Sequence, residues 1–315
     1  MSQYKLTNFD IKEYKTVFSL DPCTRDDDVI DHFYKFKYNV FVYCSAKCGS
    51  TNLHLSFSAK GIKNMHIHGA LTFAQNYKVN FSVFDLINYY TEKFPNEKFY
   101  FIDSYRTPIE RKISSFFQEN EALIKEKEVH ELIEYFNKNI YKIENYHSID
   151  QIMKESGVPM FKEFDFERGY VVQEKDNKVF IKLLFKNIDD WSYTLSQVMG
   201  TKIDMIPANK TEGKSVSNKY KEFKTLYKVP TFYLENVLPH DTHFQIYNSP
   251  QDKLDYVSQW MQKSYIQENT PDIFDPEKYI SLNKDLTKLS LFEAANHYMI
   301  HGINEKRKYK KDENT

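Results

Sequence analysis

Short apolar runs alternate with segments of helical periodicity in the first part of the chain, and this alternation constrains the fold more than any other feature. Three runs rich in β-branched and aromatic residues predict buried strands, at 39–44, 63–69 and 98–105. Helices are predicted between and after them, at 52–61 with Gly61 as the stop, at 82–94 with Ser82 as the N-cap, and from Pro108 onward. Strands that alternate with helices predict an α/β fold of three layers, in which a parallel sheet lies between helices and the crossovers are right-handed.

The later part of the chain continues with a strand pair and more helices. Residues 170–185 predict either a hairpin that turns at Asp176 or an exposed strand followed by a buried one. Two further helices are predicted, at 187–200 and 249–261. Two short helical patterns over 274–309 predict an appended module with a stop at Gly302. We therefore expect a lead-in over 1–37, an α/β domain over 38–265 and a helical module over 270–311.

The composition excludes several classes of protein. The 315 residues carry 43 Lys and Arg against 44 Asp and Glu, which disfavours a protein that coats nucleic acid. The sequence contains no run of 18 or more apolar residues, so we expect no membrane span. Its first residues are polar and lack an apolar signal segment, and we therefore expect a soluble, cytoplasmic protein. The three cysteines include Cys44 and Cys48, but no second Cys/His pair stands at zinc-site spacing, and we expect no metal.

The segment 45–51 (SAKCGST) joins the first predicted strand to the next helix, a position that suits an anion. Backbone N–H groups at a helix start carry the positive end of the helix dipole. Gly49 permits a positive φ, Lys47 adds a mobile positive charge, and Ser50 and Thr51 add hydroxyl donors. The segment is not a Walker A loop, because Lys47 precedes its only glycine, and a magnesium-dependent nucleotide hydrolase is therefore disfavoured. An ordinary polar turn is the alternative.

A second candidate anion site lies in SYRTPIERKISSFF (104–117), which holds two of the five arginines of the chain. Arg106 and Ser114 are eight residues apart, so a helix that begins at Pro108 would bring both to one anion. A guanidinium binds phosphate oxygens bidentately, which an ammonium does not do. The alternative makes Arg106 and Arg111 surface residues at a helix start, with Glu110 as a local partner.

These two motifs, in this order, resemble those of sulfotransferases that use 3′-phosphoadenosine-5′-phosphosulfate, and the R-x-P-x-x-R-x-x-S spacing resembles the carbohydrate (Golgi-type) branch. The resemblance covers residues 38–263 and implies the P-loop nucleoside-triphosphate-hydrolase-like sulfotransferase fold. It assigns two sets of residues to the cosubstrate: Lys47, Cys48, Gly49, Ser50 and Thr51 to the 5′-phosphosulfate, and Arg106 and Ser114 to the 3′-phosphate. Unlike the animal carbohydrate enzymes, this sequence shows neither a membrane anchor nor disulfides. The tail 274–309 resembles short helical modules appended to some bacterial and viral glycosyltransferases.

The resemblance also implies roles for charged and basic side chains. Lys47 is the expected partner of the leaving phosphate oxygen, and Lys210 and Lys214 either cover the phosphates or belong to a solvated, lysine-rich face. A hydroxyl acceptor needs a general base with a pKa near neutrality, which suits histidine. His68 is the first choice and His66 the second; the two alternate on the second strand and so share a face, where they could equally make structural hydrogen bonds.

The resulting prediction is a sulfotransferase that moves a sulfuryl group to a hydroxyl or amine, on a carbohydrate or similar acceptor, and releases 3′,5′-ADP. No nucleic acid or membrane span is expected among its partners. Two other functions stay open. One is a non-catalytic binding protein on a sulfotransferase scaffold, and the other is a nucleotide-dependent kinase, for which the sequence shows neither a Walker A loop nor magnesium ligands.

Overall fold

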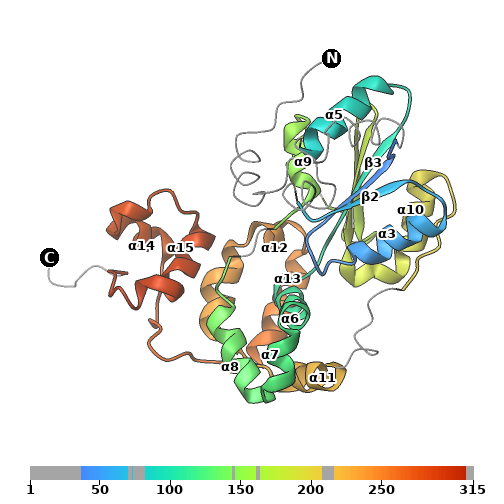
Figure 1. The fold of residues 1–315 in the computed structure, drawn as a ribbon. Helices are drawn as coiled ribbons and strands as arrows, with labels where there is room; N and C mark the ends of the chain where they lie inside the picture. Colours follow the sequence, from blue (N-terminus) through green and yellow to red (C-terminus); the bar gives the residue numbers. More distant parts are fainter. Residues whose placement is uncertain are drawn as a thin grey trace, which may run out of the picture. The chain divides into compact units, whose positions relative to one another are not determined.

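The computed structural model describes residues 37–69, 73, 82–143, 146–160, 164–207 and 216–309 (Figure 1). The chain divides into two compact units, each treated by itself below. The sheet unit holds Met1–Arg106 and Tyr146–Asn209, and the helical unit holds Thr107–Asn145 and Lys210–Thr315. The predicted lead-in, apart from its last residue, lies outside the described residues.

The sheet unit is built on a five-stranded, mostly parallel sheet with the strand order β2-β1-β3-β5-β4. The parallel strands are β1 (Val40–Tyr43), β2 (Asn64–Ile67), β3 (Phe99–Tyr105) and β5 (Lys178–Leu184). The edge strand β4 (Tyr170–Lys175) pairs antiparallel with β5 through a turn in which Asp176 has a φ of 53°. The three early strands were therefore predicted correctly, and the hairpin is one of the two alternatives predicted for residues 170–185.

Helices cover both faces of this sheet, which confirms the predicted α/β class (Figure 1). One face carries α3 (Ser50–Ala59) and α10 (Trp191–Met199), and the other carries α5 (Val83–Lys93) and α9 (Ile149–Glu155). Successive residues of a strand point to opposite faces. Val40 and Val42 of β1 thus belong to the apolar cluster that includes Leu53 of α3, whereas Phe41 packs against Tyr90 of α5.

Local signals account for the ends of these helices. Ser82 forms the predicted capping box with Asp85 at the start of α5. Gly61, after α3, has a φ of 75°, and Gly200 ends α10 in the left-handed conformation that favours glycine. The predicted helix over 187–200 is α-helical only from Trp191, because Phe185–Asp190 forms a 3₁₀ helix interrupted at Asn187.

The helical unit is a set of helices around one aromatic-rich core. Its α-helices are α6 (Pro108–Glu119), α7 (Glu121–Glu126), α8 (Val129–Asn139), α11 (Ser217–Leu226), α12 (Thr242–Ile246), α13 (Pro250–Met261), α14 (Pro276–Leu282) and α15 (Leu291–His297). Shorter elements are η3 (Tyr233–Val237), η4 (Leu238–His240), η5 (Lys284–Leu286), η6 (Tyr298–Gly302) and the strand pair β6 (Val229–Pro230) and β7 (Ser264–Tyr265). Pro108 starts α6 at its first turn, as predicted.

The tail 274–309 shares its core with the rest of the helical unit. Phe274 and Tyr298 lie 4.7 Å apart, centroid to centroid, and both rings pack against Phe232. Gly302 does not stop a helix in the left-handed conformation; its missing side chain instead leaves room for the hydroxyl of Tyr279. The two units therefore divide the chain differently from the predicted boundaries at 38–265 and 270–311.

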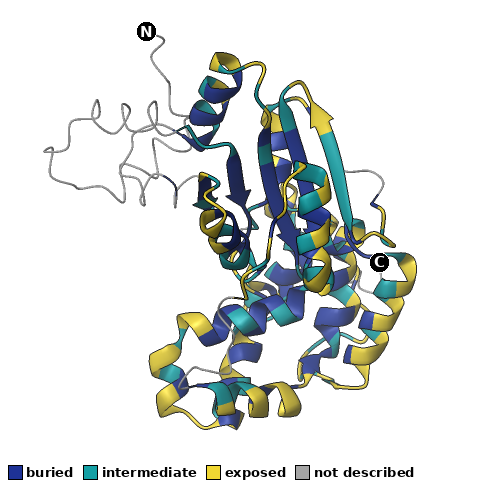
Figure 2. Cartoon of the chain, turned by 90° about the vertical axis from the view of Figure 1, so that its right-hand side faces the viewer, coloured by how far each residue is buried: buried dark blue, intermediate teal, exposed yellow. Residues whose placement is uncertain are grey.

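Burial follows this layered arrangement. Figure 2 shows the central strands buried and the outward faces of the helices exposed. Within the described residues, no helix has the length and apolar character needed to span a membrane.

Candidate functional site

The candidate site lies at the carboxyl ends of the parallel strands of the sheet unit. β2 lies on one side of β1 and β3 lies on the other, so the strand order reverses at β1. The helix that follows β1 covers one face of the sheet and the helix that follows β2 covers the other (Figure 1). Ligands of open α/β sheets bind at such a switch point, outside the carboxyl ends of the strands.

The β1–α3 loop, residues 45–49, has the strained backbone of a loop that approaches its neighbours closely. Lys47 has a φ of 67° and Gly49 a φ of 84°, which confirms the positive φ predicted for the glycine. A Cβ on Gly49 would lie 2.8 Å from Cη2 of Trp191 and 3.2 Å from Cε2 of Phe185. Both the backbone angle and the packing therefore require glycine here.

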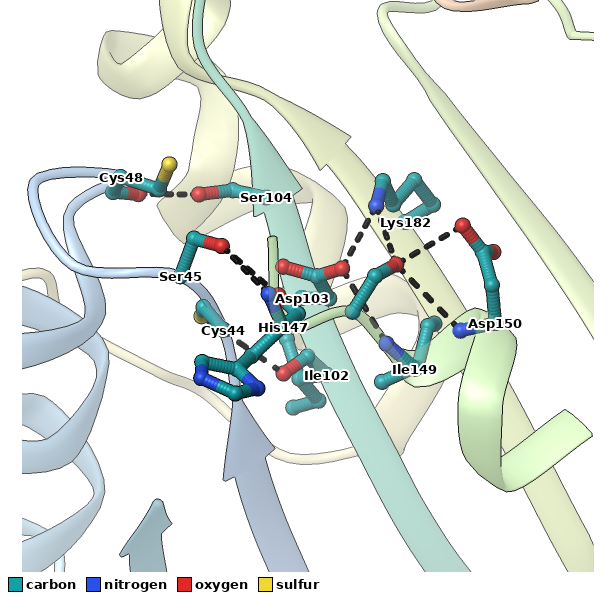
Figure 3. A network of polar contacts seen from close by, with 11 residues as sticks. Cys44, Ser45, Cys48, Ile102, Asp103, Ser104, His147, Ile149, Asp150 and Lys182 are labelled. Carbon is teal, nitrogen blue, oxygen red and sulfur yellow. Dashed lines mark hydrogen bonds and ion pairs between the residues drawn. The ribbon is translucent and has the colours of Figure 1, made fainter. Parts of the chain in front are cut away.

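Carbonyl groups of this segment accept hydrogen bonds from three side chains of neighbouring elements. His68 Nδ1 donates to Cys44 O at 2.7 Å, and Arg106 Nη1 donates to Lys47 O at 3.0 Å. The Ser104 hydroxyl donates to Cys48 O (Figure 3). Each bond fixes the direction of one carbonyl group. The loop is thus fixed by the strands beside it rather than by its own turn geometry.

These bonds also set the direction of the N–H groups. In a trans peptide the C=O and the following N–H point in opposite directions, and the described chain contains no cis peptide. The N–H groups of Cys48 and Gly49 therefore point away from Arg106 and Ser104.

The first turn of α3 adds the helix dipole to this set of donors. The helix has ten residues, no acidic residue in its first turn and no side-chain cap on its first N–H groups. Ser50 is the first helical residue and is buried, and Thr51 is half-buried. The residues predicted for the 5′ side, from Lys47 to Thr51, thus lie together where a strand leads into the start of a helix, a position that favours anions in general.

The residues predicted for the second anion site are divided between the two units. Arg106 belongs to the sheet unit, where its guanidinium lies 4.6 Å above the ring of Phe185. Ser114 lies on α6 of the helical unit, so its pairing with Arg106 stays a prediction. Arg111 is buried, which contradicts the alternative of a surface residue. Lys210 and Lys214 lie outside the described residues.

The two candidate bases differ in their surroundings, although both lie on the same side of β2 as predicted. His66 Nε2 is buried without a hydrogen-bond partner among the described residues. Burial, with smaller contributions from His68 and His54, lowers the pKa of His66 to about 4. His66 is therefore neutral at pH 7 and a weak base. In His68 the bond to the Cys44 carbonyl requires a proton on Nδ1, which leaves Nε2 as the basic nitrogen.

A buried ion pair beside the loop was missed in the sequence. Asp103 of β3 and Lys182 of β5 are register partners, both side chains are fully buried, and Oδ2 lies 2.5 Å from Nζ (Figure 3). Nζ also donates to Ser148 Oγ at 2.9 Å, and the N–H of Ile149 donates to Asp103 at 3.2 Å. Burial raises the pKa of Asp103, against the opposing effect of Lys182. The available signal was a charged residue inside each of two largely apolar strands, Asp103 in β3 and Lys182 in β5, whose other lysine, Lys178, stands at its first position.

The ion pair holds a segment that returns to the sheet unit next to the loop. The hydroxyl of Ser45, the first loop residue, donates to the carbonyl of His147 at 3.0 Å and accepts from its N–H at 2.8 Å. His147 was also missed in the sequence, because residues 119–157 show only charged, helical patterns. No local signal in the sequence places it beside the loop.

The described residues contain no cluster of His, Cys, Asp or Glu that could hold a metal ion. Comparison with known proteins identifies no relative, because no protein-family model, curated protein or solved structure matches the chain.

Proposed function

We propose that this protein is a sulfotransferase that uses 3′-phosphoadenosine-5′-phosphosulfate and transfers the sulfuryl group to a hydroxyl of a carbohydrate-like acceptor. The observation that carries the proposal is the β1–α3 loop at the switch point, whose Lys47 and Cys48 carbonyls are bound by Arg106 and Ser104, while His68 binds the carbonyl of Cys44 just before the loop. Such a loop suits a phosphosulfate without a magnesium ion. We include in this proposal that the α/β fold is that of the sulfotransferases.

The residues present fit the cosubstrate in charge and in donor chemistry. The loop N–H groups and the start of α3 bind the 5′ end, and Lys47 supplies a positive charge there. Arg106 uses one N–H toward the Lys47 carbonyl, and a guanidinium has five, so further donors can bind the 3′-phosphate. The role of Ser114 stays a prediction from the sequence. The cosubstrate, when bound, supplies an activated sulfur–oxygen bond to a phosphate oxygen.

The side chains of the site then have separate tasks in the transfer. His68 Nε2 accepts the proton of the acceptor hydroxyl while the new oxygen–sulfur bond forms. Lys47 and the loop N–H groups balance the charge that develops on the leaving phosphate oxygen as its bond to sulfur breaks. His66, with its low pKa, lines the site and does not take this proton.

Ligand binding tests the proposal without knowledge of the acceptor. We expect 3′,5′-ADP to raise the melting temperature of the protein by mass action and to bind more tightly than 5′-AMP in calorimetry, because 5′-AMP lacks the 3′-phosphate. Replacing Lys47 with Ala should weaken this binding by about tenfold or more, since a hydrogen bond to a charged group contributes roughly 1.5–3 kcal/mol. Lys60→Ala is the matched control, because Lys60 is exposed at the other end of the same helix.

The other outcomes identify the competing functions. Stabilisation by ATP with magnesium, but not by 3′,5′-ADP, would contradict the proposal and support a nucleotide-dependent kinase. No response to any nucleotide would support a non-catalytic binding protein. Once 3′,5′-ADP binding is established, transfer of labelled sulfuryl groups to a panel of oligosaccharides would identify the acceptor class.

A further inference from the structure

We propose that His147 is a second imidazole on the acceptor side of this site, where it hydrogen-bonds the acceptor while His68 removes the acceptor's proton. The inference rests on the proposed function and adds to it a residue from a segment remote in sequence. His147 lies just after the chain leaves the helical unit and re-enters the sheet unit.

The backbone of His147 is held on both sides. The Ser45 hydroxyl binds its carbonyl and its N–H, which ties the residue to the first position of the β1–α3 loop. The next residue, Ser148, is bound by the buried Lys182 and caps α9 by accepting from the N–H of Asp150 at 3.3 Å (Figure 3). A side chain on so constrained a backbone is positioned before any ligand arrives.

The ring of His147 lies against the end of β2. A Cβ on Gly69 would lie 2.4 Å from Cε1, 2.5 Å from Nδ1 and 2.8 Å from Nε2 of His147. Gly69 has a φ of 104° and directly follows His68 in the chain. Any other residue at this position would therefore collide with the imidazole, and the glycine makes room for it beside His68.

The ring has the chemistry of a group that awaits a polar ligand. It is half-buried, and within the described parts of the chain its nitrogens make no hydrogen bond. By contrast, His54 Nδ1 bonds Asn64 at 2.7 Å, as expected for a structural histidine. Burial lowers the pKa of His147, and the neighbouring His68 lowers it further, so the ring is neutral at pH 7. A neutral imidazole offers one donor and one acceptor nitrogen.

These properties give the two histidines different roles. His68 has its tautomer fixed by the Cys44 carbonyl and presents a basic Nε2. His147 is not fixed in either tautomer by a protein partner that the structure describes, so it can donate to the acceptor oxygen or accept from a neighbouring hydroxyl. A sugar presents several adjacent hydroxyls, which suits a pair of neutral imidazoles.

A first experiment tests the neighbourhood of the two rings without any substrate. In protein labelled with ¹⁵N-histidine, NMR titration gives the pKa of each ring. Replacing His68 with Gln should raise the pKa of His147, because a positive His68 disfavours a second positive charge nearby. An unchanged pKa of His147 in this variant would overturn the inference.

A second experiment tests the role in transfer, with water as the acceptor and sulfate release from 3′-phosphoadenosine-5′-phosphosulfate as the signal. His147→Ala should lower the release by about ten- to a hundredfold, the scale expected when a reactant loses its orientation, and leave 3′,5′-ADP affinity within about twofold. Added imidazole should restore part of the rate, and His147→Gln should keep more of it than the Ala variant. His130→Gln, at an exposed site on α8 of the helical unit, is the control.

The outcomes separate this inference from the function on which it rests. Wild-type protein that fails to bind 3′,5′-ADP would refute the proposed function, and the inference with it. Wild-type protein that binds 3′,5′-ADP, while the His147 variants release sulfate at the full rate, would overturn the inference alone. A parallel loss of nucleotide affinity and melting temperature without imidazole rescue would show a merely structural role and also overturn it.

Discussion

Replacing Lys182 with Met should destabilise the sheet unit severely. The substitution keeps most of the length of the side chain but removes the charge that lies 2.5 Å from Asp103 Oδ2 in a fully buried setting. Asp103 would keep the N–H of Ile149 as a donor, and its Oδ1 already lacks a partner among the described residues. Removing one member of a buried pair costs about 3–5 kcal/mol, a large share of the roughly 5–15 kcal/mol that stabilises a typical domain.

Urea unfolding followed by tryptophan fluorescence measures this loss. The chain has two tryptophans, and Trp260 belongs to the helical unit, so a Trp260→Phe background leaves the buried Trp191 as reporter of the sheet unit. The loss in free energy of unfolding that Lys182→Met causes should be smaller at acid pH. Without Lys182 the pKa of Asp103, already raised by burial, rises further, and the folded state then gains stability as the pH falls through that value.

A double variant distinguishes an ion pair from a packing effect. Asp103→Leu combined with Lys182→Met replaces both charges with apolar groups. We expect the free energy of unfolding of this double variant to lie within about 2 kcal/mol of the wild-type value. A loss of less than about 1 kcal/mol in Lys182→Met, or a double variant as unstable as the sum of the single ones, would refute the reasoning.

Two further predictions concern the loop and the histidines. Gly49→Ala should destabilise the sheet unit by about 3 kcal/mol and weaken 3′,5′-ADP binding, because the left-handed backbone and an indole ring 2.8 Å away both oppose a Cβ. The control is Gly61→Ala, at a position with a positive φ but no atom within 4 Å of the added Cβ. It should destabilise the unit by only about 1 kcal/mol and leave binding unchanged. Because of His66, the free energy of unfolding of the wild type should fall by about 2 kcal/mol between about pH 7.5 and pH 5. The pKa of His66 is about 4 in the folded state and about 6.5 in the unfolded state, so this stability is lost as the pH falls from the higher value toward the lower one. Chemical unfolding at both pH values checks this, and His66→Gln with the same pH dependence would contradict it.

The layered sheet could be predicted from the sequence because its signals are local. β1 is a buried run with glycine and polar residues directly after it, and Ser82 marks the start of α5 through its own capping box. The hairpin turn at Asp176 likewise depends on neighbouring residues. The grouping into two units was not predicted, because it depends on Phe274 and Tyr298 meeting Phe232, more than 40 residues earlier in the chain.

The candidate site likewise could be predicted only where its contacts are local in sequence. The β1–α3 loop is contiguous, so its place between a strand and a helix could be predicted from the sequence, whereas its role as an anion site stays a prediction. The position of His147 depends on the return of the chain from the helical unit and on the hydroxyl of Ser45, 102 residues away. No periodicity or motif length reports a contact of that separation.

Residues at the end of β3 hold the β1–α3 loop in place. A strand-to-helix turn alone leaves its peptide groups able to reorient toward water, and it then has no preferred ligand charge. Here Ser104 and Arg106, which belong to β3 and its end, hold two carbonyls, and the adjacent Asp103 anchors the segment that carries His147. Since Asp103, Ser104 and Arg106 lie within four consecutive positions, one strand end fixes both the carbonyls of Lys47 and Cys48 and the segment that carries His147. A change in this strand end should therefore alter nucleotide binding and acceptor positioning together, whereas a change at His147 should alter the second alone.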